Sequence, residues 1–277
     1  MQKLIFKLIS SPAIRKTVLA LRLHLLGNWW VRCFPFIKTL PGTGIRYRAR
    51  RLESIGLSVE IFKEGIYTMS ALPTDIRTFA DLGCNVGYFT CWLHHELGRP
   101  RLKGLMVDAN ADAIEDARWH VQANGFLDVQ VLCGLVGTPA EAEASFYLHR
   151  SNICSAAVPP GDISDSDAAW TRVQVAGVNI SETWRKYFGA EPCDLLKVDI
   201  EGSEMDFFRN EAAFLDTVQT ILIEWHKWRV SLSEIEQFLM QHGFVISRIL
   251  HEEQGLGTAI FVRNASKPGD KFSTATA

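Results

Sequence analysis

A glycine-containing turn between a predicted strand and a predicted helix constrains the fold of this chain most strongly. Residues 78–82 are a short, mostly apolar strand that Gly83 ends, and helical spacing of apolar residues runs from Val86 to Leu97. The turn between them reads Asp81-Leu-Gly-Cys-Asn-Val-Gly87. Glycines at such a turn let the backbone approach a ligand at the helix N-terminus, where N–H groups lack partners. The turn therefore predicts a ligand-binding α/β unit.

The chain after residue 76 repeats this alternation of strands and helices. The repetition is typical of an α/β fold with a doubly wound, mostly parallel, Rossmann-like sheet. Two short strands, 146–148 and 173–178, are expected at the edges of that sheet, and residues 158–167 are expected to form a loop. The other predicted elements are strands at 102–107, 129–133, 194–200 and 220–224, helices at 111–123 and 231–242, and a final hairpin of 244–250 with 259–263.

Acidic residues at the ends of the first two strands indicate the kind of ligand. A dinucleotide site usually has a glycine where Asn85 stands, so a pyrophosphate ligand is disfavoured. Asp81 suits a ligand with a positive end, and Asp108 stands where a carboxylate receives ribose hydroxyls. An amino-acid head joined to a ribose describes S-adenosylmethionine. The alternative is that both acids only cap the helices that follow them.

Two segments resemble the hallmark blocks of the FkbM-type methyltransferase family. They are Asp81-Leu-Gly-Cys-Asn-Val-Gly-Tyr-Phe89 and Asp194-Leu-Leu-Lys-Val-Asp-Ile-Glu-Gly-Ser-Glu204, and the resemblance covers about residues 78–262. It implies an S-adenosylmethionine-dependent, mostly O-methylating enzyme of class I, with a seven-stranded sheet whose last strand is antiparallel. The cofactor-binding residues expected from the strand ends and the resemblance are Asp81, Gly83, Cys84, Asn85, Gly87, Tyr88, Phe89, Asp108, Ala109, Asn110, Cys133, Gly134 and Asp199.

The chain departs from the family pattern at three places. Asp108-Ala-Asn-Ala111 replaces a frequent Glu-Pro-Asn-Pro, but it keeps the carboxylate and the asparagine. Cys133-Gly-Leu-Val-Gly137 offers no acid to the adenine amine, so backbone or apolar contacts to adenine are expected there. Gly177-Val-Asn179 replaces Thr-Leu-Asp, which leaves the role of that aspartate open.

Four polar residues end the fourth and fifth strands, and they are expected to converge on the methyl group of the cofactor. Asp199 is expected near the methyl group, His226 is expected to be the general base because of its ordinary pKa, and Glu201 is expected to orient His226 or the substrate. Glu224 belongs to the same group. The alternatives are that Glu201 is a first-turn acid of the next helix and that His226 is a packing residue. No metal ion is expected, because the spacing of these ligand types is scattered.

The first 52 residues differ in charge from the rest of the chain. They contain eleven Lys or Arg and no acid, so the remaining eighteen basic residues face thirty-one acidic ones, a net charge of about -13 by that subtraction. Residues 13–26 show an apolar helical stripe, and Trp29, Trp30 and Phe34 follow. This segment is expected either to pack on the catalytic domain or to lie on an anionic membrane surface. The alternating Arg46, Arg48, Arg50 and Arg51 read as an exposed strand edge, so nucleic acid is not an expected partner.

We therefore predict three regions and one main activity. Residues 1–75 form a basic extension with an amphipathic helix and lead-in strands, 76–264 the methyltransferase domain, and 265–277 a disordered tail. The expected acceptor is a small molecule or a glycan. The six cysteines form no CxxC pair and no Cys/His cluster with zinc-like spacing, so reduced thiols in a cytoplasmic protein are expected. A nicotinamide oxidoreductase and a non-catalytic scaffold remain alternatives. An aromatic platform for a sugar ring is a further expectation, made of Trp170, Trp184, Tyr187 and Trp228.

Overall fold

The computed structural model describes residues 23–98, 101–137, 143–149, 155, 157 and 170–264. The chain divides into two compact units, residues 1–67 and 68–277. Most of the predicted amphipathic helix, the predicted loop at 158–167 and the predicted tail lie outside the described residues. None of the helices in the described ranges is long and apolar enough to cross a membrane.

The first unit contains a helix, a hairpin and a second helix. Asn28 in α3 fixes the start of α4, because its Oδ1 accepts a hydrogen bond from the backbone N–H of Leu52 at 2.8 Å. The two strands pair antiparallel, with Phe36 opposite Ala49. The elements of this unit are α3 (Leu23–Cys33), β1 (Phe36–Thr39), β2 (Arg46–Ala49), α4 (Leu52–Val59) and a π-helical turn η1 (Glu60–Glu64).

The second unit is built on a seven-stranded sheet with the order β11-β12-β10-β9-β3-β4-β5. β12 runs antiparallel to both of its neighbours, and the remaining pairs within the sheet are parallel. This confirms the predicted mostly parallel, seven-stranded, Rossmann-like sheet with an antiparallel last strand. The strands are β3 (Thr78–Leu82), β4 (Lys103–Asp108), β5 (Val129–Cys133), β9 (Cys193–Val198), β10 (Val218–His226), β11 (Phe244–Glu252) and β12 (Leu256–Arg263).

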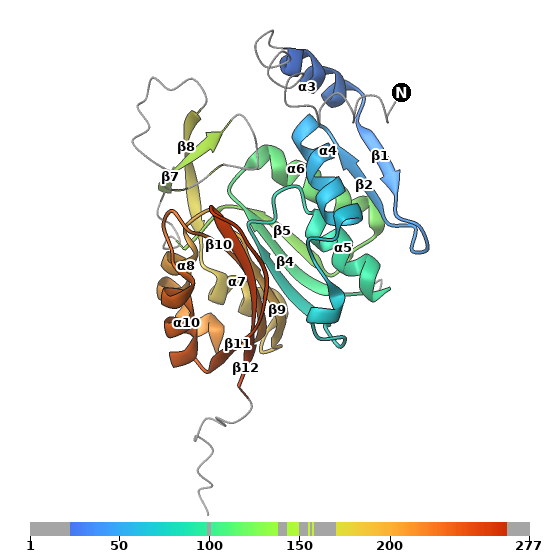
Figure 1. Cartoon of the computed structure of the whole chain (residues 1–277). Helices are drawn as coiled ribbons and strands as arrows, with labels where there is room; N and C mark the ends of the chain where they lie inside the picture. Colours follow the sequence, from blue (N-terminus) through green and yellow to red (C-terminus); the bar gives the residue numbers. More distant parts are fainter. Residues whose placement is uncertain are drawn as a thin grey trace, which may run out of the picture. The chain divides into compact units, whose positions relative to one another are not determined.

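Helices cover both faces of this sheet, with α5 and α6 on one face and α7, α8 and α10 on the other (Figure 1). The central strands are therefore mostly apolar, and every residue of β3 is buried. Ser231 begins α10 as predicted, because its Oγ accepts a hydrogen bond from the Glu234 N–H at 3.2 Å. The helices are η2 (Met69–Ala71), α5 (Tyr88–Leu97), α6 (Ala111–Asn124), α7 (Ile180–Phe188), α8 (Glu204–Asn210), α9 (Ala212–Leu215) and α10 (Leu232–Gln241).

The two strands predicted at the sheet edges form a separate small sheet instead. β7 (Glu143–His149) and β8 (Trp170–Val178) pair with each other, and β8 also pairs with β6 (Leu135–Val136) in the order β6-β8-β7. The prediction that they extend the main sheet was wrong. β6 follows β5 after one residue, Gly134, so its pairing draws β8 away from the main sheet beyond the end of β5. Phe146 then packs with Ala109 and Leu135 rather than at a sheet edge.

The order of the main sheet places its switch point between β3 and β9. From β3 the chain continues to β4 and β5 on one side, and β9 leads to β10 on the other side. The carboxyl ends of parallel strands on either side of a switch point form a crevice that commonly binds ligands. The predicted site residues follow these same strand ends.

Candidate active site

Backbone geometry at the end of β3 requires a glycine at position 83. Gly83 has φ +73, and a Cβ built there would lie 1.7 Å from the carbonyl oxygen of Asp199. The Asp199 N–H in turn donates to the Leu82 carbonyl at 3.0 Å. Asn85 also adopts a positive φ of 49, and with Gly87 (φ 86) it keeps the turn out of the helix until Tyr88. The helix therefore begins two residues later than predicted.

Asp108 links this turn by hydrogen bonds to the turn that precedes α6. Its Oδ2 accepts the Asn85 N–H and its Oδ1 accepts the Asn110 N–H, both at 2.8 Å. Asn110 caps α6 with its side chain, which accepts the Asp112 N–H at 3.1 Å. Burial raises the pKa of Asp108 to about 6, although both backbone hydrogen bonds lower it. Because an ionised carboxylate has about four acceptor positions, Asp108 keeps capacity for two more donors.

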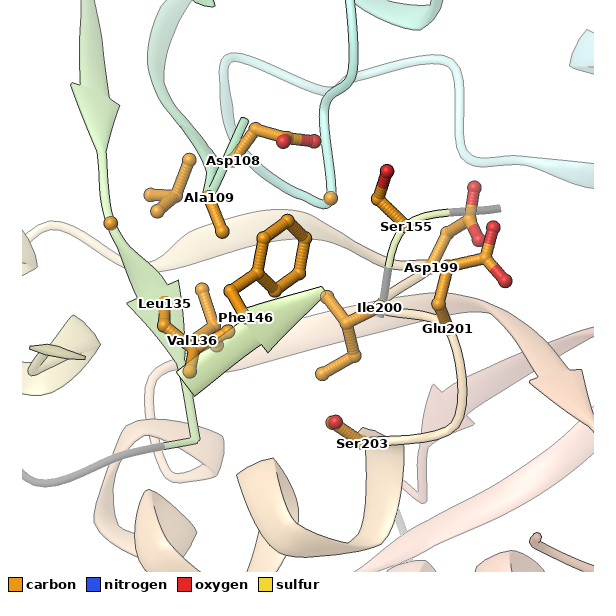
Figure 2. Close-up of a pocket in the computed structure, with 13 residues that line it drawn as sticks. Asp108, Ala109, Leu135, Val136, Phe146, Ser155, Asp199, Ile200, Glu201 and Ser203 are labelled. Atoms are coloured by element: carbon orange, nitrogen blue, oxygen red, sulfur yellow. The ribbon is translucent and has the colours of Figure 1, made fainter. Parts of the chain in front are cut away.

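These strand ends line a pocket that encloses about 440 Å³ of free space, part of it open to solvent. In Figure 2 the carboxyl groups of Asp199 and Glu201 lie to the right of the Asp108 carboxyl with Ser155 between them, and Phe146 lies below Asp108. Leu135 and Val136 of the small sheet supply an apolar wall. The lining residues are Gly83, Val107, Asp108, Ala109, Gly134, Leu135, Val136, Phe146, Ser155, Asp199, Ile200, Glu201 and Ser203.

Some of the predicted site residues line the pocket, and others do not. Among the described residues it contains Gly83, Asp108, Ala109, Gly134, Asp199 and Glu201. Tyr88 and Phe89 are buried in the core with exposures of 1% and 3%. The other predicted residues that do not line it are Asp81, Cys84, Asn85, Gly87, Asn110, Cys133 and His226.

The cation beside Asp81 is the ammonium group of Lys197, not the positive end of a ligand. It is fully buried, its Oδ2 accepts a hydrogen bond from the Thr90 hydroxyl at 3.0 Å, and the Lys197 ammonium lies 3.5 Å from its Oδ1. Lys197 also donates to the Gly83 carbonyl at 3.2 Å and to Asp199 Oδ2 at 3.1 Å. Burial raises the pKa of Asp81, and the nearby ammonium opposes that rise. Lys197 thus joins the glycine turn to the end of β9.

The sequence interpretation gave Lys197 no role. Its signal is a lysine inside a predicted strand, 194–200, whose other residues are apolar except Asp194 and Asp199. A buried lysine requires a carboxylate partner, and Asp81 and Asp199 were both available as candidates.

His226 lies between two carboxylates at the end of β10. Its Nδ1 is 2.9 Å from Glu204 Oε1 and its Nε2 is 3.1 Å from Glu201 Oε2. Burial lowers the pKa of His226, but the hydrogen bonds to Glu201 and Glu204 outweigh burial and raise it to about 11. The ring therefore holds both protons at neutral pH and donates one to each carboxylate. An imidazolium has no lone pair with which to accept a substrate proton.

Among the described carboxylates of this cluster, Glu224 has the longest distance to a cation. Its Oε1 lies 4.0 Å from His226 Nε2, and its side chain is 24% exposed. Burial raises the pKa of Glu224 to about 8, and the charge of Asp199 adds to that rise. A carboxyl group with this pKa exchanges its proton near neutral pH.

Asp199, Glu224 and His226 have the residue types of a cation site, and one potential ligand atom of each lies within 4.8 Å of the others. An imidazole binds a metal only after it loses its proton. Here Glu201 and Glu204 hold that proton on His226, and Lys197 already pairs with Asp199. With these partners in place, the three side chains bind protons and the Lys197 ammonium.

The structure also places Asn179, Trp184 and Trp228. Asn179 is the N-cap of α7, where its Oδ1 accepts the Glu182 N–H at 2.8 Å, which an aspartate would do equally well. Trp184 is 2% exposed in the core, so it is not part of a sugar platform. Trp228 is 42% exposed, and its ring atom Cζ2 would lie 2.7 Å from a Cβ placed on Gly202.

S-adenosylmethionine fits the pocket by three observations. The absent side chain of Gly83 leaves the backbone of the turn open to a close approach. Asp108 has spare acceptor capacity for the ribose hydroxyls. Phe146, Leu135 and Val136 provide an apolar surface for the adenine ring.

Comparisons with known proteins show similarity to methyltransferases. Residues 126–246 match the family model described as a methyltransferase FkbM domain. The chain is 23% identical over 226 residues to methyltransferase sdnD from Sordaria araneosa, covering 73% of this chain and 86% of that protein.

Two solved structures illustrate the likeness. An FkbM methyltransferase from Methylobacillus flagellatus is 12% identical with a TM-score of 0.47, over 74% of this chain and 47% of that one. An S-adenosylmethionine-dependent methyltransferase from Aquifex aeolicus is 12% identical with a TM-score of 0.44, over 74% of this chain and 92% of that one. The chain thus spans about half the length of the Methylobacillus structure. Residues 126–246 are thus similar to the FkbM methyltransferase domain, and this similarity together with the pocket at the sheet edge supports an S-adenosylmethionine-dependent methyltransferase.

Proposed function

We propose that the enzyme methylates a hydroxyl group on a glycan or a small metabolite. The observation that carries this proposal is the meeting of three carboxylates, Asp199, Glu201 and Glu224, at the ends of β9 and β10 beside the cofactor pocket. Methyl transfer to oxygen needs alignment of the acceptor with the methyl donor and a base for the hydroxyl proton. Carboxylates at the donor end of the pocket supply both functions.

In this proposal the cofactor supplies an electrophilic methyl group, and the chain positions it. The glycine turn at Gly83 would hold the amino-acid end of the cofactor, Asp108 would accept hydrogen bonds from the ribose hydroxyls, and Phe146 would contact the adenine ring. Asp199 and Glu201 line the pocket, where their carboxylates would place negative charge near the positive sulfur of the bound cofactor. Lys197 holds Asp199 in position and also anchors the Gly83 carbonyl.

We assign the role of general base to Glu224 in place of His226. A base works best when its pKa lies near the working pH, and burial brings the pKa of Glu224 to about 8. His226 acts as a fixed cation between Glu201 and Glu204, and it keeps Glu201 turned toward the pocket. Glu201 stands at a φ of 52, a strained conformation for a residue with a side chain, as often occurs at functional sites.

Trp228 supports a glycan or another ring-bearing acceptor. Its exposed indole lies over Gly202, next to Glu201 in the chain and therefore next to the donor end of the pocket. Exposed aromatic faces are suited to contact the apolar face of a sugar ring. We expect Trp228→Ala to raise KM for the acceptor with little change in kcat.

The proposal is tested with a panel of glycosides, phenols and amines, scored by S-adenosylhomocysteine formation and by product mass and position of methylation. With the best acceptor, kcat of the wild type is expected to rise about tenfold per pH unit until about pH 8, where Glu224 has lost its proton. Glu224→Gln is expected to lower kcat by about 10²–10⁴-fold and to remove that rise. Glu252→Gln, an exposed acid paired with Lys227, is the matched control with unchanged kcat. Methylation of amines alone, or an unchanged profile in Glu224→Gln, would contradict the proposal.

A further inference from the structure

We propose that the first unit binds the surface of an anionic membrane through the outward side of α3 and the start of β1. This surface, here called the aromatic face, consists of exposed apolar residues and one cysteine. They are Leu26, Trp29, Trp30, Cys33, Phe34 and Ile37. These residues belong to the first unit, a different part of the chain from the active-site residues, and their role is independent of the methyl acceptor.

An ordinary amphipathic helix packs its large apolar side chains against the protein, whereas α3 exposes them. Gly27, Asn28 and Val31 face α4: a Cβ on Gly27 would lie 2.8 Å from Leu52, Asn28 accepts from the Leu52 N–H, and Val31 is buried. At 100° per residue, positions 26, 29, 30 and 33 lie on the opposite side of the helix. A small and a polar residue thus occupy the packed side, and two tryptophans occupy the open side.

The exposed aromatic residues form a continuous group. Trp29 is 60% exposed, Trp30 58% and Phe34 61%, and the rings of Trp30 and Phe34 lie 4.7 Å apart. Single exposed apolar residues are common on soluble proteins, but a contiguous apolar group indicates a binding surface. Tryptophan in particular favours the boundary between water and lipid, because its ring is apolar and its N–H is polar.

The charge around the aromatic face selects an anionic surface as the occupant. Arg32 is exposed within α3, Lys38 follows in β1, and Arg46 lies opposite Thr39 across the hairpin. The first 52 residues contain no acid, and the next residue, Glu53, accepts a hydrogen bond from Asn28 at 3.4 Å. Interfacial helices combine aromatic residues with Lys and Arg because anionic lipids attract the cations while the rings enter the headgroup region. An apolar protein surface would complement the rings but not the net basic charge of residues 1–52.

The test uses the full chain with vesicles of phosphatidylcholine alone or mixed with phosphatidylglycerol, measured by co-sedimentation and by quenching of tryptophan with brominated lipid. Binding is expected with the anionic vesicles only, and it should weaken as salt rises. The triple variant Trp29→Ser, Trp30→Ser, Phe34→Ser is expected to bind at least tenfold more weakly. Arg32→Glu is expected to weaken binding by a smaller factor.

Two controls separate membrane binding from damage to the fold. Leu127→Ser changes an 84% exposed residue of the second unit and should bind vesicles like the wild type. All variants should bind S-adenosylhomocysteine with wild-type affinity. Equal vesicle binding by the triple variant and the wild type, or no binding to anionic vesicles, would overturn the proposal. Dissociation of a wild-type dimer by the triple variant, seen in sedimentation velocity, would instead assign the aromatic face to a second copy of the chain.

Discussion

The two halves of the active site are held together by different means. At the ends of β3 and β4, the backbone fixes the site: Gly83 has no room for a Cβ, and Asp108 accepts N–H groups from both turns. At the ends of β9 and β10, charges on side chains fix it: His226 and Lys197 are each bound by two carboxylates. We infer that the first half provides a rigid cofactor site, and that the second half sets where protons reside during catalysis.

The largest effect is expected for Gly83→Ala. The added Cβ meets the Asp199 carbonyl at 1.7 Å in a positive-φ conformation, so we expect a loss of more than about 4 kcal/mol in the free energy of unfolding and no detectable cofactor binding. Chemical denaturation and calorimetry measure both quantities. Gly125→Ala is the matched control: it has φ +64 with nothing within 4 Å, so it should cost only about 1 kcal/mol and leave binding intact. Equal effects of the two substitutions would show that the turn is not sterically fixed.

His226→Gln is expected to have the next largest effect, and on stability rather than on cofactor affinity. It removes the cation that holds Glu201 and Glu204, which we expect to lower the free energy of unfolding by about 3 kcal/mol. Retention of wild-type stability would show that the ring is neutral in the folded chain.

The pH dependence of the same variant sharpens this test. The pKa of His226 is raised from 6.5 to about 11, so its stabilisation is complete below pH 6.5 and is lost as pH rises through about 11. The wild type should therefore lose stability across that window more steeply than His226→Gln. Parallel unfolding curves for the two proteins would contradict the assigned proton.

Asp108→Asn tests the backbone-fixed half with a smaller change. The amide keeps the shape of the side chain but loses the charge and one acceptor, so S-adenosylhomocysteine should bind about tenfold to a hundredfold more weakly, about 1.4–2.7 kcal/mol. In the wild type, affinity should fall as pH drops below about 6, where Asp108 takes up a proton. Over the same window, the contribution of Asp108 to the free energy of unfolding should rise as pH drops. The reason is that its pKa is raised from 3.8 to about 6 in the folded chain, so the folded state takes up the proton before the unfolded state does. Affinity that is flat between pH 4 and 7 would remove Asp108 from the cofactor site.

The smallest effect is expected from a chelator. Because His226 holds its proton between two glutamates, dialysis against EDTA should leave methyl transfer unchanged. Loss of activity with recovery on adding Mg²⁺ or Mn²⁺ would mean that a metal, rather than a proton, balances the charge of Asp199 and Glu224.

The difference between the two halves also explains what the sequence could predict. The strands Thr78–Leu82 and Val129–Cys133 lie at their predicted bounds, because short apolar runs next to Gly83 and before Gly134 mark them clearly. The turn and Asp108 were found because their chemistry depends on residues close together in sequence or on a regular strand spacing.

Features that depend on distant partners could not be predicted in the same way. The pairing of β8 with β6 joins segments about forty residues apart, and apolar alternation alone cannot distinguish a small separate sheet from a main-sheet edge. The charge state of His226 depends on Glu204, twenty-two residues earlier, and on the turn that brings Glu201 beside it. The ordinary pKa of histidine suggested a base, and only the partners show a fixed cation.

The most direct test of the central claim is calorimetric titration of the folded wild type with S-adenosylhomocysteine, alongside the same titration with NADH. The account predicts one site per chain with micromolar affinity for S-adenosylhomocysteine, no heat with NADH, and loss of the first signal in Gly83→Ala but not in Gly125→Ala. A folded wild type that binds NADH, or that binds neither ligand, would contradict the assignment of this sheet edge to S-adenosylmethionine.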